Sequence, residues 1–529
     1  AAATEKMMTH NLDDLPGYLT IIPNRLVFAV IPETGRNSQI DPHDPSRVYL
    51  CSDTNLIYEQ FFADFGPLSV ACIVRFCRQL SSLLQDPAHE EKLVVYHSSD
   101  HAHRRSNAAV LVCAFAMVEL KRSVIQAYAP FMGVEPPLSP FRDASFGVCS
   151  CCLTVVDCVR GIGRALSCQH FTPHSFDVEE YMYLDCVENG DVSWIVPGKF
   201  IAFSGPLAKK REMEPGKFTM GPEDYVPLFH RLGVTAVVRF NQKKYDESHF
   251  TSQGIKHFDL FYQDGGNPPE ELMQKFLKLC EKEPGAIAVH CKAGLGRTGT
   301  NIACYMMKHY GYTAMEATAW LRICRPGSVV GPQQQYCQDA QARLWRQGEE
   351  MRQQQKQRQE KRESPRNKER PFPGVTPKKS SGTVDTHNGS SSSSSSSNNK
   401  SIFSVVVVVV LASGHAVGIG SALERHVGVR VGGASASPDC KRQDFRVVPR
   451  LFHPPKNSNN CTAAAAAAAA PAIPLCRSPK RQQEGGCWSA VGRGGQKVRA
   501  FAERQARDGV LSLGEEKRRQ GCSGGGRGE

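Results

Sequence analysis

Four residues in the second half of the chain have the types and spacing of a phosphate-handling cysteine site. His290, Cys291, Arg297 and Thr298 form the pattern H-C-x5-R-T directly after the apolar run AIAV. A loop of small residues lets successive backbone N–H groups turn inward and form an anion-binding concavity. The pattern therefore predicts a phosphate loop between a buried strand and a helix that begins near Arg297, made of Cys291, Lys292, Ala293, Gly294, Leu295, Gly296 and Arg297.

Each fixed position of this pattern has a chemical reason. The positive N-terminus of the helix favours both phosphate and a thiolate at Cys291, which makes this cysteine the predicted nucleophile. Arg297 offers a planar fork that matches two phosphate oxygens. Thr298 can donate its hydroxyl to the sulfur and help it leave in a second step, and His290 is expected to orient the loop rather than to transfer a proton.

A departing alkoxide needs a proton donor, and Asp264 in the segment FYQDGGNPP is the candidate. A turn aspartate without catalytic function is the alternative, but the neighbouring cysteine loop favours the acid. Hydrolysis of a phosphocysteine also needs a positioned water molecule. Gln333 and Gln334 in VGPQQQ are the candidates for that task, with Gln333 preferred, and a glutamine-rich helix start is the alternative.

The elements that position these residues belong to a faint internal repeat. The segments FFADFGPLSVACIVRF, from Phe61, and LFYQDGGNPPEELMQKF, from Leu260, each predict a strand ending in Asp and Gly, a loop with Pro, and a helix. The segments from Val94 and from Ala286 each predict a strand, a loop with His and Arg, and a helix. We therefore expect an α/β protein with two tandem domains of similar plan, although such units resemble one another in many proteins.

The first copy lacks a nucleophile of the same kind. Its loop HSSDHAHRRSN has Ser98 or Ser99 where the thiol would belong, and neither serine has an identifiable activating base. We expect this domain not to be catalytic, with a loop that either binds anions or closes the domain.

Composition divides the 529 residues into a globular part and a tail. The first 345 residues hold 33 of the 64 Lys and Arg and 37 of the 52 Asp and Glu, whereas residues 346–529 hold 31 basic and 15 acidic residues. Serine, valine and alanine runs follow residue 389, and such sequence buries too little apolar area to fold. The predicted divisions are a non-catalytic domain (10–174), a linker helix (175–195), a catalytic domain (196–345) and a disordered basic tail (346–529), in which the stretch just after Trp345 can continue a helix.

Several classes of protein are disfavoured by the sequence. No run of about 18 apolar residues could span a membrane, and the polar start AAATEKMMTHNLDD does not resemble a secretory signal. The 20 cysteines are expected to be mostly reduced in an intracellular chain. We expect neither a metal nor a cofactor, since CSCC at Cys149–Cys152 has no partner pair at a metal-binding spacing. The expected location is the nucleus and cytoplasm, with the nucleolus, centrosome and spindle as narrower candidates.

With these residues in place, residues 10–345 resemble the cell division cycle fourteen family of dual-specificity protein phosphatases. The resemblance rests on AVHCKAGLGRTGT, ICRPGSVVGPQQQ, ADFGPL, PFRDASFG and VENGDVSWIVPGKFIAFSGP. It implies two tandem cysteine-phosphatase-like domains joined by a linker helix, of which only the second is catalytic. It also implies activity on phosphoserine followed by proline with a basic residue downstream, at sites made by cyclin-dependent kinases, as well as on phosphotyrosine, and hence a role in cell-cycle control.

The family also has an acidic groove for the basic part of the substrate, with carboxylates from the linker helix. Asp185 and Asp191 match two of these positions, and a third falls on the uncharged Met182. The resemblance thus makes Asp185 and Asp191 groove residues, with compensation for Met182 expected from nearby carboxylates, namely Glu179, Glu180 and Glu188.

Two other functions compete with this interpretation. The loop HCKAGLGRTG is also similar to that of phosphatase-and-tensin-homologue lipid phosphatases, which carry a second lysine where Leu295 stands. The other alternative is a scaffold that binds phosphoproteins without turnover. Thr376-Pro377 and Ser478-Pro479 in the tail resemble proline-directed kinase sites, which suggests regulation by phosphorylation. The basic tail predicts at most non-specific binding to nucleic acid.

Overall fold

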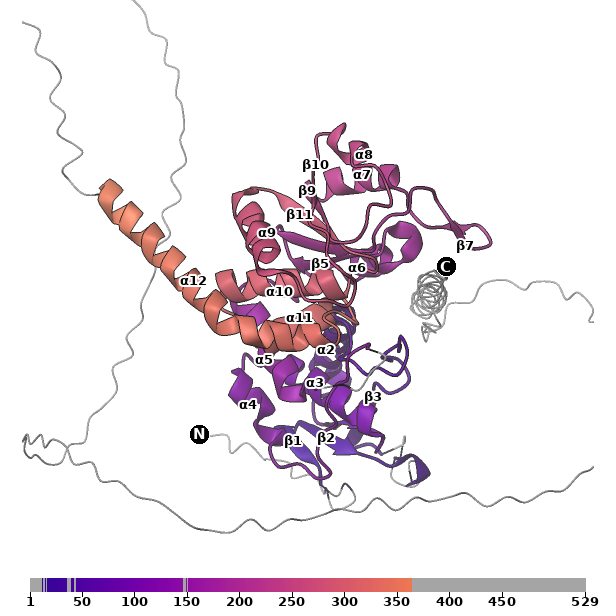
Figure 1. Ribbon diagram of the computed structural model, residues 1–529. Coiled ribbons are helices and arrows are strands. Elements are labelled where there is room, and N and C mark those ends of the chain that lie inside the picture. Colours follow the sequence, from indigo (N-terminus) through magenta and orange to yellow (C-terminus); the bar gives the residue numbers. More distant parts are fainter. Residues whose placement is uncertain are drawn as a thin grey trace, which may run out of the picture. The chain divides into compact units, whose positions relative to one another are not determined.

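The computed structural model describes residues 17–363, with gaps at 36–39, 42–43, 146–148 and 150, together with Leu12 and Leu15. These residues all belong to one compact unit. They form an N-terminal half (17–174) and a C-terminal half (192–363), each with its own sheet and helices (Figure 1). The helix α6 (Val178–Asp185) and the short 3-10 helix η4 (Val187–Asn189) connect the two halves.

The N-terminal half is built on a four-stranded sheet with the order β1-β2-β4-β3, in which β4 runs parallel to β2 and β3 and β1 is antiparallel. Every residue of the central strand β4 is buried, which explains the nearly continuous apolar sequence LVVYHS. The strands are β1 (Leu19–Ile22), β2 (Leu26–Val30), β3 (Arg47–Cys51) and β4 (Leu93–Ser98). The helices are α2 (Val70–Gln85), α3 (Ala102–Val118), α4 (Val124–Tyr128) and α5 (Val155–Ser167), with the 3-10 helices η1 (Glu33–Gly35), η2 (Pro87–His89) and η3 (Ala129–Phe131).

The C-terminal half is built on a five-stranded sheet with the order β10-β9-β11-β6-β5, parallel except for β5. Its central strand β11 is likewise buried at every residue. The strands are β5 (Val192–Val196), β6 (Phe200–Phe203), β9 (Val234–Arg239), β10 (Lys256–Asp259) and β11 (Ala286–His290), with a separate hairpin of β7 (Glu212–Glu214) and β8 (Lys217–Phe218). The helices are α7 (Pro222–Arg231), α8 (Ser248–Thr251), α9 (Glu270–Lys282), α10 (Gly296–Tyr310), α11 (Ala314–Cys324) and α12 (Pro332–Glu363).

The two sheets have the same strand order. Counted from the antiparallel edge, β1-β2-β4-β3 corresponds to β5-β6-β11-β9, and the C-terminal half adds β10 at the far edge. In both halves the third strand in this order leads through a loop into a helix, β4 into α3 and β11 into α10. The predicted fold class, two tandem domains of one plan, is confirmed.

Neither segment predicted as a strand ending in Asp and Gly is one, since in the second copy β10 ends at Asp259, before Leu260. The segment FFADFG in the N-terminal half is irregular, and Phe65 makes only an isolated bridge with Arg142. The carboxylate of Asp64 accepts hydrogen bonds from the backbone N–H groups of Phe61 and Phe62, both at 2.8 Å, and from the hydroxyl of Tyr58. Because these hydrogen bonds join the Asp64 side chain to the residues just before it, the segment forms a turn instead of an extended strand.

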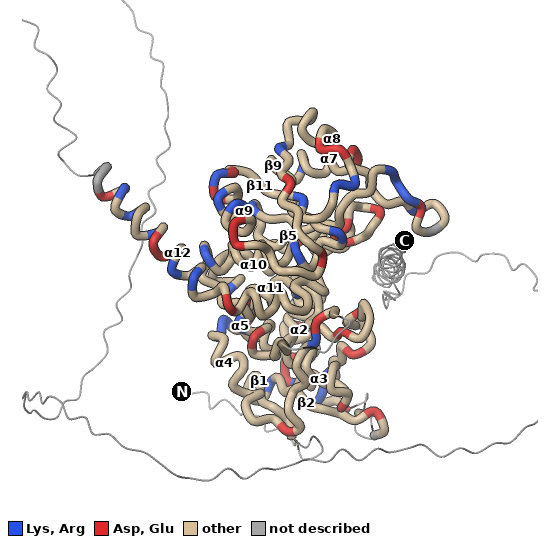
Figure 2. The backbone as a smooth tube through the Cα atoms, in the orientation of Figure 1, with Lys and Arg blue, Asp and Glu red and all other residues tan. Residues whose placement is uncertain are grey.

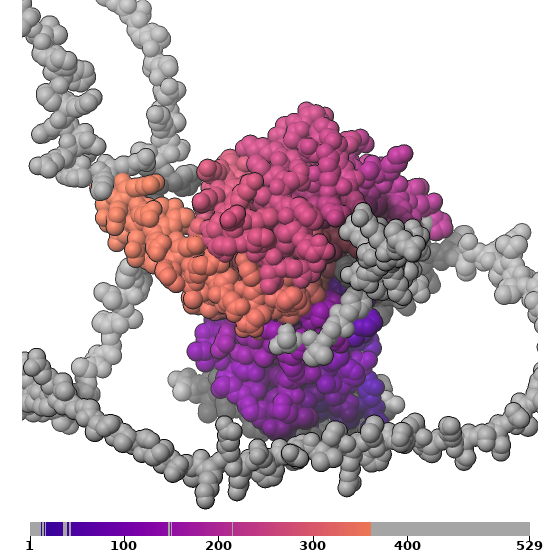
Figure 3. Space-filling view, viewed as in Figure 1, coloured from indigo at the N-terminus to yellow at the C-terminus, as the bar shows by residue number. Residues whose placement is uncertain are grey.

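The two halves share an apolar core through α5 and α11. Gly161 on α5 allows this close approach, since a Cβ placed there would lie 2.9 Å from both the backbone oxygen of Glu316 and the Cβ of Ala319. Phe171 packs against Trp320 across the same interface, with ring centroids 5.6 Å apart. The halves therefore meet over a broad packed face, along which α12 lies (Figure 3).

The observed element bounds differ from the predicted domain bounds at two places. The linker helix is shorter than 175–195, because Gly190 at φ 114° turns the chain and β5 then begins at Val192, inside that range. At the other end, α12 runs to Glu363, so residues 346–363 continue the helix, as the sequence allowed for the stretch just after Trp345, and the tail bound at 346 falls inside α12 (Figure 2).

The remainder of the predicted tail, residues 364–529, lies outside the described residues, as do its kinase-like sites and the valine run. Among the residues that the structure describes, no helix is both long enough and apolar enough to cross a membrane.

Candidate active site

The predicted phosphate loop connects β11 to α10. The strand ends at His290, residues 291–295 form the loop, and the helix begins at Gly296, one residue before the predicted start. Gly294 has φ 68°, and a Cβ there would lie 2.0 Å from the backbone oxygen of Phe203, so only glycine fits. Leu295 at the N-cap position makes no side-chain cap, which leaves the N–H groups of the first turn available to an anion.

Two buried donors that follow the predicted nucleophile in the sequence have no hydrogen-bond partner among the described residues. Cys291 is buried, with 3% of its surface exposed. Arg297 donates through Nη1 to the backbone oxygens of Tyr262, at 2.9 Å, and Phe240, at 3.3 Å, while its buried Nε has no partner within the described residues. The buried Oγ1 of Thr298 also lacks a partner there. These two groups have the chemistry to bind a phosphate oxygen and the cysteine sulfur, respectively.

His290 is a structural support of the loop. Because the backbone oxygen of Cys291 can only accept, Nδ1 of His290 donates to it at 3.0 Å, and Nε2 accepts from the Tyr245 hydroxyl at 2.7 Å. The same hydroxyl then accepts from Nε2 of His257 at 2.9 Å. Burial lowers the pKa of His290 to about 3, so the ring is neutral at neutral pH and suits the predicted orienting function.

Asp264 lies at the mouth of the site on an exposed turn between β10 and α9. Its Oδ1 lies 3.0 Å from Nη2 of Arg297, and 54% of its side chain is exposed. The strand β10 ends at Asp259, so Asp264 belongs to the loop and not to the end of a strand as its sequence context suggested. The structure thus places the predicted acid within reach of the group that would bind phosphate, and it leaves the loop room to move.

The two glutamines at the start of α12 have different surroundings. Gln333 donates through Nε2 to the backbone oxygen of Gly266 at 3.1 Å, and a Cβ on Gly296 would lie 2.8 Å from its Oε1. Gln334 instead accepts from Arg322 at 2.9 Å and donates to the oxygen of Gly331. Only Gln333 therefore packs between the phosphate loop and the loop of Asp264, which favours it over Gln334 as the water-positioning residue.

Arg325 holds the phosphate loop from behind. It is buried and donates to the backbone oxygens of Ala293 and Gly294, both at 2.9 Å. Its Nη1 also donates to Oδ1 of Asp191 at 2.9 Å and to Oγ of Ser193 at 3.1 Å. Burial acts to lower the pKa of Arg325, but Asp191, Asp185 and Cys291 together outweigh burial and the pKa is raised. Asp191, predicted as a groove residue, thus binds Arg325, the residue that holds the phosphate loop.

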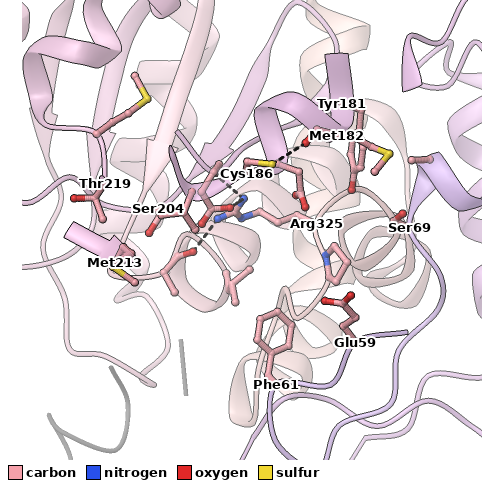
Figure 4. A pocket seen from close by; sticks show the side chains of 18 of the residues that line it. Glu59, Phe61, Ser69, Tyr181, Met182, Cys186, Ser204, Met213, Thr219 and Arg325 are labelled. Carbon is pink, nitrogen blue, oxygen red and sulfur yellow. Dashed lines mark hydrogen bonds and ion pairs between the residues drawn. The ribbon is translucent and has the colours of Figure 1, made fainter. Parts of the chain in front are cut away.

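A pocket of about 250 Å³ opens beside the phosphate loop, with walls from both halves of the protein. Ala293 and Leu295 belong to its lining. Figure 4 shows Glu59 and Phe61 of the N-terminal half on one side and Ser204, Met213 and Thr219 of the C-terminal half on the other, with Arg325 between them.

The acidic part of this pocket differs from the predicted one. Asp185, Asp191 and Met182 line it as expected, but Glu179 pairs with Arg75 at 3.5 Å and Glu180 with Arg231 at 2.9 Å, and neither of these glutamates belongs to the lining. The additional carboxylate is Glu59. Its Oε2 is buried with no hydrogen-bond partner among the described residues, and burial together with the nearby Asp185 raises the pKa of Glu59.

The loop of the N-terminal half is closed by a carboxylate. Oδ2 of the buried Asp53 accepts from the backbone N–H of Ser99 at 2.7 Å and lies 4.0 Å from Arg104. The hydroxyl of Ser98 is buried and donates to the backbone oxygen of Ser99 at 3.2 Å. The Asp53 carboxylate thus occupies a loop N–H group that would otherwise be free to contact a phosphate, which favours domain closure over anion binding.

Sequence reasoning did not single out Glu59 or Arg325. Both had a signal nearby, since Glu59 lies four residues before the start of ADFGPL and Arg325 lies within ICRPGSVVGPQQQ. Each of the two residues is far in sequence from the residues that it meets in the site. Such long-range contacts form only when the chain folds, so the sequence does not show them.

Comparison with known proteins matches both halves to phosphatase families. Residues 20–165 match the family "Dual specificity protein phosphatase, N-terminal half", and residues 190–362 match "Swiss Army Knife protein, DSP-PTPase phosphatase domain". Dual specificity protein phosphatase CDC14A of Homo sapiens is 46% identical over 337 residues, which are 64% of this chain and 56% of the relative.

Two further relatives are covered more completely. CDC14B of Mus musculus is 41% identical over 65% of this chain and 70% of its own length, and CDC14C of Homo sapiens is 41% identical over 63% and 73%. The match spans little more than half of human CDC14A, whereas it spans over two thirds of these two proteins. From the paired family matches, the shared identity and the loop geometry, this chain belongs to the CDC14 family of dual-specificity protein phosphatases.

Proposed function

We propose that this chain is a protein phosphatase that hydrolyses phosphoserine, phosphothreonine and phosphotyrosine through a phosphocysteine intermediate. The observation that carries the proposal is the set of groups around Cys291. A buried thiol lies at the start of a loop that leads into an uncapped helix N-terminus, next to Arg297, whose Nε has no partner within the described residues. Asp264 lies 3.0 Å from that arginine.

In the first step the thiolate of Cys291 attacks phosphorus, a P–S bond forms, and the bond from phosphorus to the ester oxygen breaks. Nε and Nη2 of Arg297 bind two phosphate oxygens, and the phosphate displaces Asp264 from Nη2. Asp264, freed and protonated, gives its proton to the departing alkoxide. The exposed loop around Asp264 allows the carboxyl group to make this short movement.

In the second step a water molecule attacks phosphorus and the P–S bond breaks. Asp264, now a carboxylate, takes a proton from the water, and Gln333 orients the water between the phosphate loop and Gly266. The hydroxyl of Thr298, which has no other partner in the described part of the chain, donates to the sulfur as it becomes a thiolate again. Inorganic phosphate then leaves.

The pocket beside the loop supports a preference for a basic residue downstream of the phosphorylated one. Glu59 and Asp185 both line this pocket, close enough for Asp185 to help raise the pKa of Glu59, and a lysine or arginine of the substrate would pair with both carboxylates. Glu59 supplies the negative charge that Met182 lacks at the third groove position. The apolar surface of Phe61 and Leu295 in the same pocket suits the proline that follows the phosphoserine.

We further infer that the substrates are phosphoproteins made by proline-directed kinases such as the cyclin-dependent kinases, and that the chain acts in cell-cycle control in the nucleus and cytoplasm, with the nucleolus, centrosome and spindle as candidate sites. Regulation through phosphorylation of the tail is part of this proposal. The support for these points is the family membership and the acidic pocket.

Initial rates on four substrates test the proposal. These are a phosphoserine-proline peptide with lysine three residues after the phosphoserine, its lysine-to-alanine version, a phosphotyrosine peptide and a 3-phosphoinositide, each with EDTA present. We expect the lysine-bearing peptide to be the best substrate and Cys291→Ser to be inactive. Fast turnover of the lipid alone would assign a phosphoinositide phosphatase, and no turnover of any substrate would favour a phosphoprotein-binding scaffold.

The structure favours the protein substrate over the lipid at one position. Leu295, where the lipid phosphatases carry a second lysine, is buried against Gly327, whose Cβ would lie 3.3 Å from the leucine Cδ1. A buried leucine offers no charge to a polyanionic inositol headgroup.

A further inference from the structure

Two sequence motifs of the N-terminal half, ADFGPL and PFRDASFG, pair with each other in the fold. The backbone N–H of Arg142 donates to the oxygen of Phe65 at 2.7 Å, and that of Phe65 donates back to Arg142 at 3.1 Å. The guanidinium of Arg142 also donates to the backbone oxygen of Ala63 at 3.0 Å. This pairing fixes the backbone directly before Asp143.

Asp143 extends from this pair to the C-terminal half. Its side chain is buried, and its Oδ2 accepts from the backbone N–H of Gly331 at 2.6 Å. Its other oxygen, Oδ1, accepts from the hydroxyl of Ser145 at 2.9 Å. A carboxylate from the non-catalytic half thus contacts the loop that leads into α12 of the catalytic half.

That loop has a strained backbone. Val329 has φ 60° and Gly331 has φ 57°, and a β-branched residue adopts a positive φ only where its surroundings enforce it. On one side, Arg322 donates to the backbone oxygens of Ser328, at 3.0 Å, and Val329, at 2.8 Å. On the other side, Asp143 holds Gly331. The loop is therefore held from both sides, once by each half of the protein.

The held loop determines where Gln333 points. The backbone N–H of Val330 donates to Oε1 of Gln333 at 3.1 Å, which turns the amide Nε2 toward the backbone oxygen of Gly266. Gly266 lies two residues after Asp264. The residue held by Asp143, Gly331, is joined by one peptide bond to Val330, which holds Gln333, and Gln333 in turn donates to the loop of the predicted acid.

We propose that Asp143 of the non-catalytic half is a positioning residue for the hydrolysis of the phosphocysteine. This proposal rests on the proposed phosphatase function and concerns its second step. The attacking water forms a bond to phosphorus and gives a proton to Asp264, and the bond to the Cys291 sulfur breaks. Asp143 touches none of these atoms and acts by fixing the loop that aims Gln333 at the water.

The experiment compares Asp143→Ala with Asp143→Asn in the full chain, on an aryl phosphate whose release can be followed in the first turnover. Loss of the contact should lower kcat about tenfold and leave kcat/KM within about twofold, because kcat/KM reports the steps up to the phosphocysteine. The initial burst of product and the amount of phosphoenzyme trapped by acid should both rise. Asparagine keeps an oxygen for Gly331 and should restore nearly normal rates.

Asp157→Ala is the matched control. Asp157 also accepts a hydrogen bond from a backbone N–H, that of Thr154 at 3.0 Å, but within the N-terminal half at the start of α5. Loss of this hydrogen bond should lower the stability of the protein, and any effect on kcat should be matched by an equal effect on kcat/KM. In a second test, Asp143→Ala should have little further effect on kcat in a Gln333→Ala background, because its influence passes through that glutamine.

Equal losses in kcat and kcat/KM for Asp143→Ala, an Asn variant as impaired as the Ala variant, or full additivity with Gln333→Ala would each overturn the inference. If instead the unmodified chain turned over no phosphate ester, the proposed function would fail before this inference was tested.

Discussion

Asp191 allows a test between two functions for one carboxylate. The family resemblance makes it a groove residue that meets the basic part of the substrate, whereas the structure engages it with Arg325 at 2.9 Å, with only 14% of its side chain exposed. If the structural role dominates, removal of Asp191 should affect every substrate equally. If the groove role dominates, it should affect only substrates with a basic residue.

The expected magnitudes follow from burial. Asp191→Ala would leave the buried guanidinium of Arg325 without its hydrogen-bonded carboxylate, which costs about 3–5 kcal/mol of unfolding free energy when one partner of a buried pair is removed. Asp191→Asn keeps an acceptor and should cost about 1–2 kcal/mol. Because Arg325 also holds the oxygens of Ala293 and Gly294, we expect kcat/KM for Asp191→Ala to fall about 100-fold.

Urea unfolding at neutral pH gives the free energy, and kcat/KM is measured on the lysine-bearing peptide and on its alanine version. The ratio of the two kcat/KM values should stay within about twofold of the unmodified protein for both Asp191 variants. Asp185→Asn is the comparison, and it should lower this ratio. A stable Asp191→Ala protein that has lost only its preference for the lysine peptide would refute the reasoning.

Three further predictions concern single groups. Asp264→Asn should lower kcat/KM by about 100-fold or more on a phosphoserine peptide, whose alkoxide needs a proton, and far less on p-nitrophenyl phosphate; equal losses would argue against an acid at this position. Glu59→Gln should lower kcat/KM about three- to fivefold on the lysine-bearing peptide and leave the alanine peptide unaffected, and an unchanged ratio would remove Glu59 from the basic subsite. Burial lowers the pKa of His290 to about 3, so this histidine binds a proton in the unfolded chain below pH 6.5 but not in the folded one. Its contribution to stability is therefore lost as pH falls, by about 2 kcal/mol between pH 6.5 and 5. Urea unfolding at both pH values should show a smaller loss in His290→Asn, and an equal loss would contradict this account.

The phosphate loop could be predicted from sequence because its chemistry is contiguous. Nucleophile, arginine and threonine lie within eight residues between a buried strand and a helix, so local geometry alone brings them together. The tandem fold could also be predicted, since β4 with α3 and β11 with α10 have similar patterns of apolar and polar residues. Asp264 was found only because the loop chemistry demanded an acid, and its exact setting, in a turn beyond β10, was not foreseen.

The supports of the loop could not be predicted in the same way. Arg325 and Asp191 are 134 residues apart, and Gly331 and Asp143 are 188 residues apart. Such pairs form through the packing of two domains, and a single sequence has no periodicity that records them. The strained φ of Val329 is equally invisible, since valine ordinarily disfavours that conformation.

The position of Asp143 and Glu59 implies that the C-terminal half cannot function normally alone. The N-terminal half has no thiol in its loop, yet it supplies a wall of the pocket and one of the two supports of the strained loop. It also covers α11, since Trp320 packs against Phe171 in a core that is continuous across the halves. Residues 190–363 expressed alone would expose this apolar face.

We therefore expect the fragment 190–363 to aggregate or to unfold at a markedly lower temperature than the full chain, as measured by thermal unfolding and size-exclusion chromatography. Any soluble fraction should form phosphocysteine on an aryl phosphate and hydrolyse it slowly. A soluble fragment with the kcat of the full chain would contradict both the shared core and the inference about Asp143. A fragment that is folded but slow in kcat alone would contradict the shared core and support the inference about Asp143, because an aryl phosphate needs the chemistry of the loop and the aim of Gln333 but not the pocket wall.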